Sequence, residues 1–449
     1  MNRVAYKELS EKIFAAGKGK FEDMETYIER DKTIEIAVYN GEIDRYNISE
    51  TEGLSLRGIS NGKMGYSYTE KLDESSIDML IEEAYENGKY IDSLDREIIY
   101  EGSGSYKELN NFNPKLKETP LEKKIDFVKS LEKEAYRLDP RIVSISYCMY
   151  QEMEKSRHLF NTKGLDLNDS MNLAISYLMV VAREEEDTKT GISYRIVKDF
   201  SALDYKAMAK EAVDDAISQL GARPVKSGNY PVIIRNDTFA DILEAFSSVL
   251  YADSVQKGLS LLKGKIGEEV ANSKFTLVDD PFIEEGFNVC SFDGEGTATR
   301  VKKIIDRGVL TTYLYNWKTA LKDGVESTGN GFRNSYKSNV TTSVTNLYVQ
   351  KGEKSLNELL ELMGNGVMIT DVQGLHSGLN PVSGDYSLSA QGYLIENGKI
   401  SRPVNLITIA GNFFETLKDI EEIGSDFRFS SNGVGSPSIL IRKLAIAGE

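Results

Sequence analysis

One short segment, residues 221–228, separates two parts of the chain that differ in sequence pattern. It reads Gly-Ala-Arg-Pro-Val-Lys-Ser-Gly, follows a helical pattern that ends at Gly221, and precedes a β-branched run at residues 230–234. A single hydrophobic core stops growing at about 250–300 residues, and this chain has 449. We therefore predict two domains, an N-terminal one at residues 1–222 and a C-terminal one at residues 223–449.

The N-terminal part shows the order helix, strands, helix twice. Asn-Gly pairs at positions 40–41 and 61–62 predict hairpin turns within the first set of strands. This order indicates an α/β domain of meander strands with flanking helices, and its repetition suggests two similar modules. We expect helices at residues 6–16, 75–90, 119–138 and 204–220, and strands at residues 27–68, 142–153, 158–161 and 173–182.

The third helix has the most complete start signal. Thr119 is placed to cap it, Pro120 occupies the first helical position, and Glu122 is spaced to close a capping box. Apolar residues then recur at steps of three and four positions. A polar, Gly/Ser/Asn-rich connector at residues 101–117 precedes this helix.

The C-terminal part contains one helical pattern, at residues 238–251, followed by many short β-branched runs. Asp-Gly, Asn-Gly and Gly-Asn-Gly turn signals separate these runs. Because helices do not alternate regularly with strands, a doubly wound fold is disfavoured. We predict an α+β protein whose C-terminal domain is a mostly antiparallel, barrel-like sheet with one buried helix.

The net charge of −16 limits the partners of this chain. Its long-range field repels nucleic acid and anionic membranes alike. No stretch approaches the about 18 apolar residues needed to span a bilayer, and no apolar leader precedes a cleavage site. Two cysteines far apart, Cys148 and Cys290, make a disulfide framework improbable. We expect a cytoplasmic protein without direct nucleic-acid or membrane binding.

Only two histidines occur, His158 and His376, and this supply limits the available chemistry. A metal site would have to combine His376 with Cys290 and a carboxylate such as Asp293 or Asp385, and no spacing pattern favours that combination. The segment Gly374–Gly378, with Ser377 inside it and Ser383 and Asp385 nearby, is the one dense candidate for serine chemistry. It lacks the G-x-S-x-G elbow and is better interpreted as a Gly-rich turn.

Several segments across roughly 200 residues of the C-terminal part occur in a recognisable order. The segments are Leu243–Ser248, Asp253–Gly258, Phe292–Gly296, Ser327–Arg333, Gly374–Asn380, Gly384–Leu388, Gly392–Gly398 and Ile409–Asn412. Together they resemble the TldD/PmbA family, a metallopeptidase family also described as modulators of DNA gyrase. The resemblance covers the N-terminal part in layout, with weaker motifs.

The two subfamilies differ in one window. TldD-type chains carry HExxxH on a helix, and this chain has Leu243, Glu244 and Ser248 at the three matching positions. Residues five apart on a regular helix are rotated by about 140°, so two histidines at that spacing need a π-type widening to reach one metal. Without a metal to stabilise that distortion, we expect a more regular helix here and interpret Glu244 as a structural or relic residue.

The resemblance therefore implies a PmbA/TldE-type subunit that lacks zinc ligands and pairs with a TldD-like catalytic subunit, which would hold the zinc, to process peptides. In isolation the chain could form a homodimer. The alternatives are an autonomous peptidase or hydrolase with an improvised site, and a non-catalytic protein-binding regulator of gyrase. Residues that we expect to contact substrate or partner are Asp293, Glu295, Gly296, His376, Ser377 and Gly378.

Overall fold

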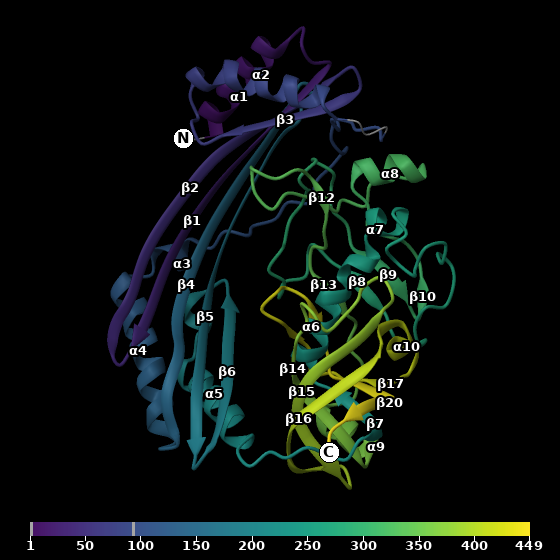
Figure 1. Ribbon diagram of the computed structural model, residues 1–449. Helices are drawn as coiled ribbons and strands as arrows, with labels where there is room; N and C mark the ends of the chain where they lie inside the picture. The colour runs from purple at the N-terminus through teal and green to yellow at the C-terminus, as the bar shows by residue number, and fades with distance from the viewer. Residues whose placement is uncertain (1–2, 92–94) are drawn as a thin grey trace.

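A six-stranded antiparallel sheet forms the N-terminal half of the computed structural model, which describes residues 3–91 and 95–449 (Figure 1). Its strand order is β3-β2-β1-β4-β5-β6, so two three-stranded meanders join through β1 and β4. The strands are β1 Asp23–Tyr39, β2 Glu42–Ser60, β3 Lys63–Thr69, β4 Ile142–Asn161, β5 Asp166–Glu184 and β6 Asp187–Val197.

The hairpin turns lie where the Asn-Gly pairs predicted them. Asn40 and Gly41 have φ values of 53° and 81°, and Asn61 and Gly62 have 51° and 72°. Two consecutive positive φ angles match the right-handed twist of the flanking strands, and Asn followed by Gly adopts them at low cost. This local chemistry fixes the register of the first meander.

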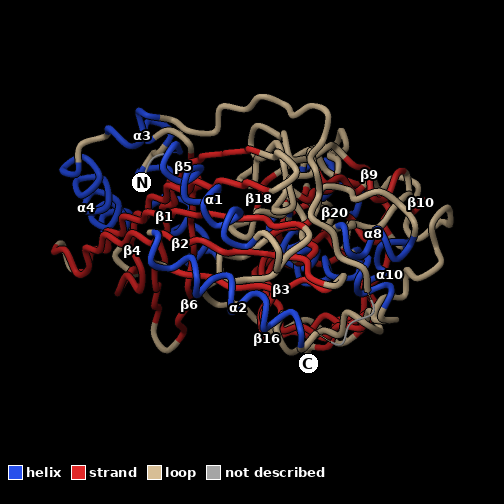
Figure 2. Tube along the Cα trace, turned by 90° about the horizontal axis from the view of Figure 1, so that it is seen from above, coloured by secondary structure: helices blue, strands red, loops and turns tan. Residues whose placement is uncertain are grey.

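Helices cover one face of the sheet at its two ends (Figures 1 and 2). The pair α1 (Arg3–Gly17) and α2 (Ile77–Lys89) packs at one end, around Ile28 and Leu54. The longer α4 (Leu121–Leu138) and α5 (Tyr205–Ser218) pack at the other, around Ile36 and Leu178. Short turns of helix also occur, namely α3 Pro114–Glu118 and two 3₁₀ segments at Glu74–Ser76 and Phe200–Ala202.

Two local predictions are wrong here. Thr119 does not cap α4, because its hydroxyl donates to the carbonyl of Lys115 and so ends α3; α4 begins without a side-chain cap. The strands predicted at 142–153 and 158–161 are one strand, β4. The intervening polar residues continue the strand because Lys155 and Arg157 form ion pairs with Glu29 and Asp169 on neighbouring strands.

The C-terminal half is built around a closed five-stranded barrel, as the turn-rich pattern predicted. Its strand order is β16-β15-β14-β7-β20, closed by pairing of β16 with β20, and only β7 and β14 pair in parallel within it. Helix α6 (Asn236–Phe246) packs its apolar face into this core. The barrel strands are β7 Gly228–Ile234, β14 Gly366–Gln373, β15 Asp385–Glu396, β16 Lys399–Asn412 and β20 Ile439–Ala447, with β17 Ile420–Ile423 outside β20.

A second sheet, in the order β10-β9-β8-β13-β19-β18, flanks the barrel. Its strands are β8 Leu277–Asp279, β9 Lys302–Asp306, β10 Val309–Leu310, β13 Leu347–Val349, β18 Arg428–Phe429 and β19 Gly435–Ser436. The remaining elements are the hairpin β11 Gly331–Phe332 and β12 Thr341–Thr342, the helices α7 Ala252–Gln256, α8 Trp317–Asp323, α9 Leu356–Met363 and α10 Phe413–Lys418, and a 3₁₀ turn at Ser247–Leu250.

The N-terminal sheet curves around one side of the C-terminal half and touches it at both ends (Figure 1). Near α1 and α2, Tyr66 and Glu25 contact Tyr336 and Arg333. Near α5, the hydroxyls of Ser218 and Tyr393 lie 2.6 Å apart. The chain passes from the N-terminal sheet to the C-terminal half after α5. That residues 1–222 and 223–449 fold as separate domains stays a prediction. None of the described helices combines the length and apolar character needed to cross a bilayer.

Candidate functional site

The window that resembles HExxxH lies at the end of α6 and divides between two environments. Leu243 is only 2% exposed and belongs to the barrel core, beside Phe246. Glu244 is exposed, about 100° further around the helix. Ser248 is half-buried and belongs to the 3₁₀ turn that follows α6. The three positions therefore do not face one point.

The helix stays regular through Phe246, as expected, and then tightens. The predicted single helix at 238–251 is wrong in its second part, because the backbone changes to a 3₁₀ turn over Ser247–Leu250. A 3₁₀ turn narrows the helix, whereas convergence of side chains five apart needs a wider turn.

The residues of this window do not fit zinc. A zinc site takes three or four nitrogen, sulfur or carboxylate ligands within about 2.0–2.3 Å of one point. Here Leu243 supplies no donor and Glu244 is the only ionisable side chain. Across residues 3–91 and 95–449, no group of three or more His, Cys, Asp or Glu side chains is arranged to hold a metal.

Helix α6 presents a polar stripe on its exposed face. Asp237, Asp241 and Glu244 follow one another at four- and three-residue steps, which places them on one side of α6. Ser248 follows four residues on, in the 3₁₀ turn. Asp241 and Glu244 are close enough for the Glu244 carboxylate to help raise the pKa of Asp241. The stripe thus links the window to the open space at the start of α6.

That open space is a cleft of about 820 Å³ between the two halves, which we call the domain cleft. Strands β5 and β6 and helix α5 form one wall, and α6, β14 and β15 form the other. Carboxylates outnumber cations among its lining residues. The charged ones are Glu211, Asp214, Asp215, Asp237, Asp241, Asp371 and Asp426, against Arg235 and Arg428.

The two arginines hold part of this acidic lining. Arg235 binds Asp237 in a two-pronged contact of 2.7 and 3.0 Å. Arg428 donates to Glu211 at 2.7 Å and stacks on the ring of Tyr194 at 4.5 Å. These contacts fix the cleft walls through planar guanidinium groups, which are suited to carboxylates and aromatic rings.

Asp241 is the most perturbed carboxyl group of the cleft. Burial raises its pKa to about 6, and the neighbouring carboxylate of Asp237 adds to the rise. Burial also raises the pKa of Asp371 and Asp215, although Arg235 opposes the effect at both. A group that changes charge near pH 6 inside a cleft can take up or release a proton under ordinary conditions.

Three of the residues expected to contact substrate or partner lie in a buried joint between the two halves. Asp293 is fully buried and accepts backbone N–H bonds from Glu295, Thr297 and Gly331, each at 2.9 Å. Glu295 accepts the N–H of Trp317 at 2.8 Å. Burial raises the pKa of Glu295, against the opposing charge of Arg57.

Gly296 belongs to the same joint. Its carbonyl accepts the hydroxyl of Tyr106 at 2.7 Å, and a β-carbon at this position would lie 2.5 Å from Leu165. Its φ of 82° is a second reason for glycine. In this structure Asp293, Glu295 and Gly296 contact the chain itself, and their role toward a peptide or partner stays a prediction.

The centre of the joint is a charge pair between segments far apart in sequence. The guanidinium of Arg333 bonds the carboxylate of Glu25, and both side chains are about 1% exposed. Arg333 also donates to the Gly294 carbonyl at 3.2 Å and to the Ser55 hydroxyl at 3.3 Å. Arg57 lies 3.6 Å from Glu25 and 3.8 Å from Glu295.

His376, Ser377 and Gly378 lie in the loop between β14 and β15. His376 and Ser377 are exposed, and the N–H groups of Ser377 and Gly378 donate to the Gly374 carbonyl at 3.0 and 2.6 Å. Among the described residues, His376 has no hydrogen-bond or ion-pair partner. The segment is therefore a turn, as interpreted, and the expected contacts of these three residues stay a prediction.

The residues considered for an improvised metal site, Cys290, Asp385 and His376, lie in different environments. Cys290 is buried, and burial raises the pKa of its thiol to about 12, which keeps the thiol protonated. Asp385 is exposed and accepts from the Asn412 side chain at 3.0 Å. Together with the exposed position of His376, this arrangement gives no shared site.

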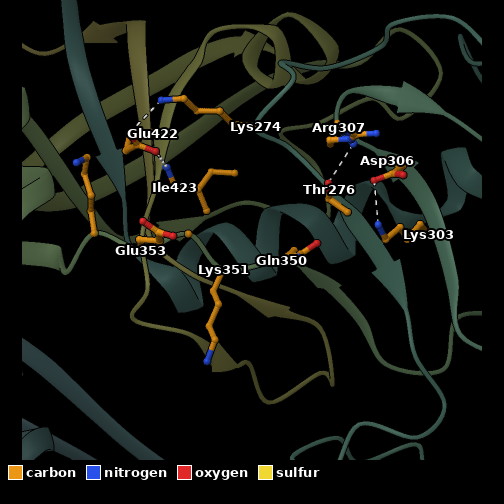
Figure 3. Close-up of a pocket in the computed structure, with 12 residues that line it drawn as sticks. Lys274, Thr276, Lys303, Asp306, Arg307, Gln350, Lys351, Glu353, Glu422 and Ile423 are labelled. Carbon is orange, nitrogen blue, oxygen red and sulfur yellow. Dashed lines mark hydrogen bonds and ion pairs between the residues drawn. The ribbon is translucent and has the colours of Figure 1, made fainter.

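A second cavity, of about 630 Å³, lies within the C-terminal half and shares no lining residue with the domain cleft (Figure 3). Lys274 pairs with Glu422 at 3.0 Å and Lys303 with Asp306 at 3.1 Å. Figure 3 shows Lys351 pointing away from the other labelled side chains. The cationic side chains named for this second cavity therefore do not converge on a common point.

Sequence reasoning did not identify the residues of the domain cleft. Arg235, Asp237, Asp241 and Asp371 belong to no recognised motif. Asp237 and Asp241 come from α6, Asp371 comes from the barrel strand β14, and Arg235 directly precedes α6. One signal was available, because the acidic stripe interrupts an otherwise apolar helix at helical spacing. The wall contributed by α5, which includes Asp215, could be identified only from the fold.

Family models match most of the chain. They are described as PmbA/TldA metallopeptidase domain 1 at residues 24–88, central domain at 114–220, and C-terminal domain at 227–448. A Haemophilus influenzae protein named metalloprotease PmbA homolog is 27% identical over 421 residues, which cover 91% of this chain and 88% of that protein.

Solved structures agree over the full length. A Thermotoga maritima protein described as a modulator of a DNA gyrase has a TM-score of 0.92 and 33% identity, covering 98% of this chain and 100% of that one. TldE from Thermococcus kodakarensis has a TM-score of 0.90 and 23% identity, with coverage of 98% and 100%, and so shares the fold. The chain belongs to the PmbA/TldD metallopeptidase family.

Proposed function

We propose that this chain is the subunit without zinc ligands in a two-subunit cytoplasmic peptidase, in which a TldD-like chain supplies the zinc. Its relatives are named metalloproteases, which supports a peptidase role at the level of the family. The more specific proposal, that this chain is the subunit without zinc ligands, rests on one observation. Leu243 occupies the position of the first histidine of HExxxH and lies in the barrel core, and Glu244 is the only ionisable side chain of the window, exposed on α6.

In this role the chain supplies walls of a peptide-binding space. The domain cleft has room for several residues of an extended peptide, and tyrosines 177, 194 and 393 line it beside the carboxylates. Strand backbones and aromatic rings hold extended peptides without reading every side chain. The acidic lining favours peptides that carry lysine, arginine or a free amino terminus.

An isolated Glu244 does not replace a zinc centre. A carboxylate can accept a proton from water, but it does not lower the pKa of that water from about 15.7 toward 7 as zinc does. This chain alone therefore lacks the zinc-activated water that a metallopeptidase uses to hydrolyse peptides.

The test is reconstitution. The chain and an HExxxH-bearing relative from the same organism are purified separately, and peptide hydrolysis is measured for each alone and for the mixture with zinc. We expect activity in the mixture only, together with co-elution of the two chains. A mixture in which the partner's two histidines are replaced by alanine is the control and has no activity. Full hydrolysis by this chain alone would contradict the proposal.

A further inference from the structure

Strand β2 has an open hydrogen-bonding edge along its first half. Strand β1 pairs with β2 from Glu42 to Ile59, but β3 covers β2 only from Leu54 to Ser60. Within the described ranges 3–91 and 95–449, no strand pairs with the outer edge of residues 42–53. Figure 1 shows this stretch at the outer margin of the N-terminal sheet. Its outward N–H and C=O groups are free to extend the sheet.

The same stretch exposes apolar side chains. Ile43, Tyr46 and Ile48 are 43%, 44% and 56% exposed. Their cross-strand partners on β1 are Val38, Ile36 and Ile34, which pack beneath α4 on the helix-covered face of the sheet. The apolar layer under α4 therefore continues past the helix to the open edge.

The protection of this edge against pairing is its acidic charge and one irregularity. Natural edge strands are shortened, bulged or charged, or carry proline or lysine, which discourage a second strand. Residues 42–53 contain neither proline nor lysine, and their register with β1 shifts only at Asp44. From Arg45 to Gly53 the pairing with β1 is regular, so the acidic charge is the main obstacle to a second strand there, and a strand of opposite charge does not meet it.

Charge distinguishes between the possible partner strands. Glu42, Asp44, Glu50 and Glu52 lie along the edge, against one cation within the stretch, Arg45, which binds Glu35 at 2.7 Å. Arg30 on β1 pairs with Glu50 at 2.6 Å, and Lys129 on α4 lies 4.0 Å from Glu42, so part of the acidic charge is already compensated. A second copy of this edge, paired antiparallel and centred on Asn47, would put Glu42 opposite Glu52 and Asp44 opposite Glu50.

Neighbouring symmetric registers also place like charges opposite each other. Pairing centred on Tyr46 puts Glu42 opposite Glu50, and pairing centred on Ile48 puts Asp44 opposite Glu52. Like charges directly opposite one another destabilise a strand pair. A strand with lysine or arginine at these positions pairs without that penalty, and its cations gain the opposite charge of this edge.

We infer that residues 42–53 of β2 dock a lysine- or arginine-bearing edge strand of a different subunit, which extends the N-terminal sheet across the subunit boundary. This inference rests on the proposed function, because it takes the HExxxH-bearing partner as the occupant. It goes beyond that proposal by assigning the surface, the pairing mode and the charge of the partner strand.

The test compares two charge reversals with the same change in net charge. Asp44→Lys lies on the open edge, and Glu186→Lys lies in the exposed turn between β5 and β6, away from it. Neither carboxylate has a hydrogen-bond or ion-pair partner among the residues that the structure describes, so both variants should fold. Binding of each purified variant to the HExxxH-bearing relative is measured by calorimetry, and self-association by sedimentation.

We expect Asp44→Lys to weaken binding by about tenfold and Glu186→Lys to leave it unchanged. A second edge variant, Ile48→Thr, keeps the strand-forming β-branch and removes apolar contact, and it should weaken binding by about fivefold. Equal affinity of the unaltered chain and both edge variants would overturn the inference and leave the proposed function standing. A change confined to self-association would also overturn it, because the occupant would then be a second copy. No binding by the unaltered chain would end both proposals.

Discussion

The buried joint and the domain cleft are both built from charged side chains between the same two halves of the molecule, yet they differ in exposure. In the joint, Arg333 and Glu25 are about 1% exposed and bond directly to each other. In the cleft, Asp241 and Asp371 are half-buried and line a space of about 820 Å³. In the first arrangement the charges bond to each other, and in the second they face an open space.

This difference separates structural from functional charge. A charge taken out of water is tolerated only when partners replace its hydration, so each member of the joint depends on the others. A half-buried charge keeps part of its hydration and remains able to exchange water for a ligand. Substitutions in the joint should therefore act on stability, and substitutions in the cleft on titration and binding.

The largest effect is expected in the joint. Arg333→Met keeps an unbranched apolar side chain but removes the guanidinium group, and it leaves Glu25 buried with the more distant Arg57, at 3.6 Å. Breaking one side of a buried pair costs about 3–5 kcal/mol. Urea denaturation should therefore show a free energy of unfolding lower by that amount.

Arg30→Met is the matched control, because Arg30 on the same sheet pairs with Glu50 in the open, at 41% and 46% exposure. Exposed pairs contribute about 0–1 kcal/mol. Equal destabilisation by the two substitutions would show that burial does not distinguish the joint.

The distinction between the two regions was not readable from sequence. The Asn-Gly hairpins were predicted because their cause is local, in two adjacent residues with positive φ. The Arg333 to Glu25 bond spans 308 positions, and no periodicity relates its partners. The segment around Asp293 and Glu295 was recognisable, but recognition did not show that these side chains are buried against the N-terminal sheet.

The window on α6 illustrates the same limit. The sequence indicated the missing histidines and a regular helix, since both follow from residue type and spacing. It did not indicate that the helix tightens at Ser247 or that Leu243 and Glu244 face opposite environments. Those features depend on the barrel core, which is formed by strands from residue 228 to the end of the chain.

A smaller effect is expected in the cleft, in the pH dependence of stability. Burial raises the pKa of Asp241 to about 6 from its ordinary value of 3.8. The folded state therefore binds this proton more tightly than the unfolded state, and stability falls as pH rises from about 4 to about 6. That rise in pKa corresponds to at most about 3 kcal/mol, and solvent at this half-buried side chain reduces the effect. Asp241→Asn should therefore remove about 1–2 kcal/mol of that fall, measured by urea denaturation at pH 4, 5, 6 and 7.

The control is Asp44→Asn, which makes the same chemical change at an exposed position on β2. Comparison of the two variants separates the effect of burial at Asp241 from the loss of one carboxyl group. A profile of Asp241→Asn that matches the unaltered chain would mean that the Asp241 carboxyl is hydrated like a surface group, and the cleft would then lose its titrating residue.

The smallest effect is expected at Glu244, where the comparison is sharpest because its neighbour Leu243 lies in the core. Glu244→Gln should change the free energy of unfolding by less than about 0.5 kcal/mol, as for an exposed side chain. Leu243→Ala, one position away, should cost about 3 kcal/mol through the cavity it leaves.

In the reconstituted pair, Glu244→Gln should keep peptide hydrolysis within about twofold, because no metal-bound water depends on this carboxylate. A loss of more than about tenfold with stability intact would mean that Glu244 contacts the peptide or the reacting water, and the relic interpretation would be wrong.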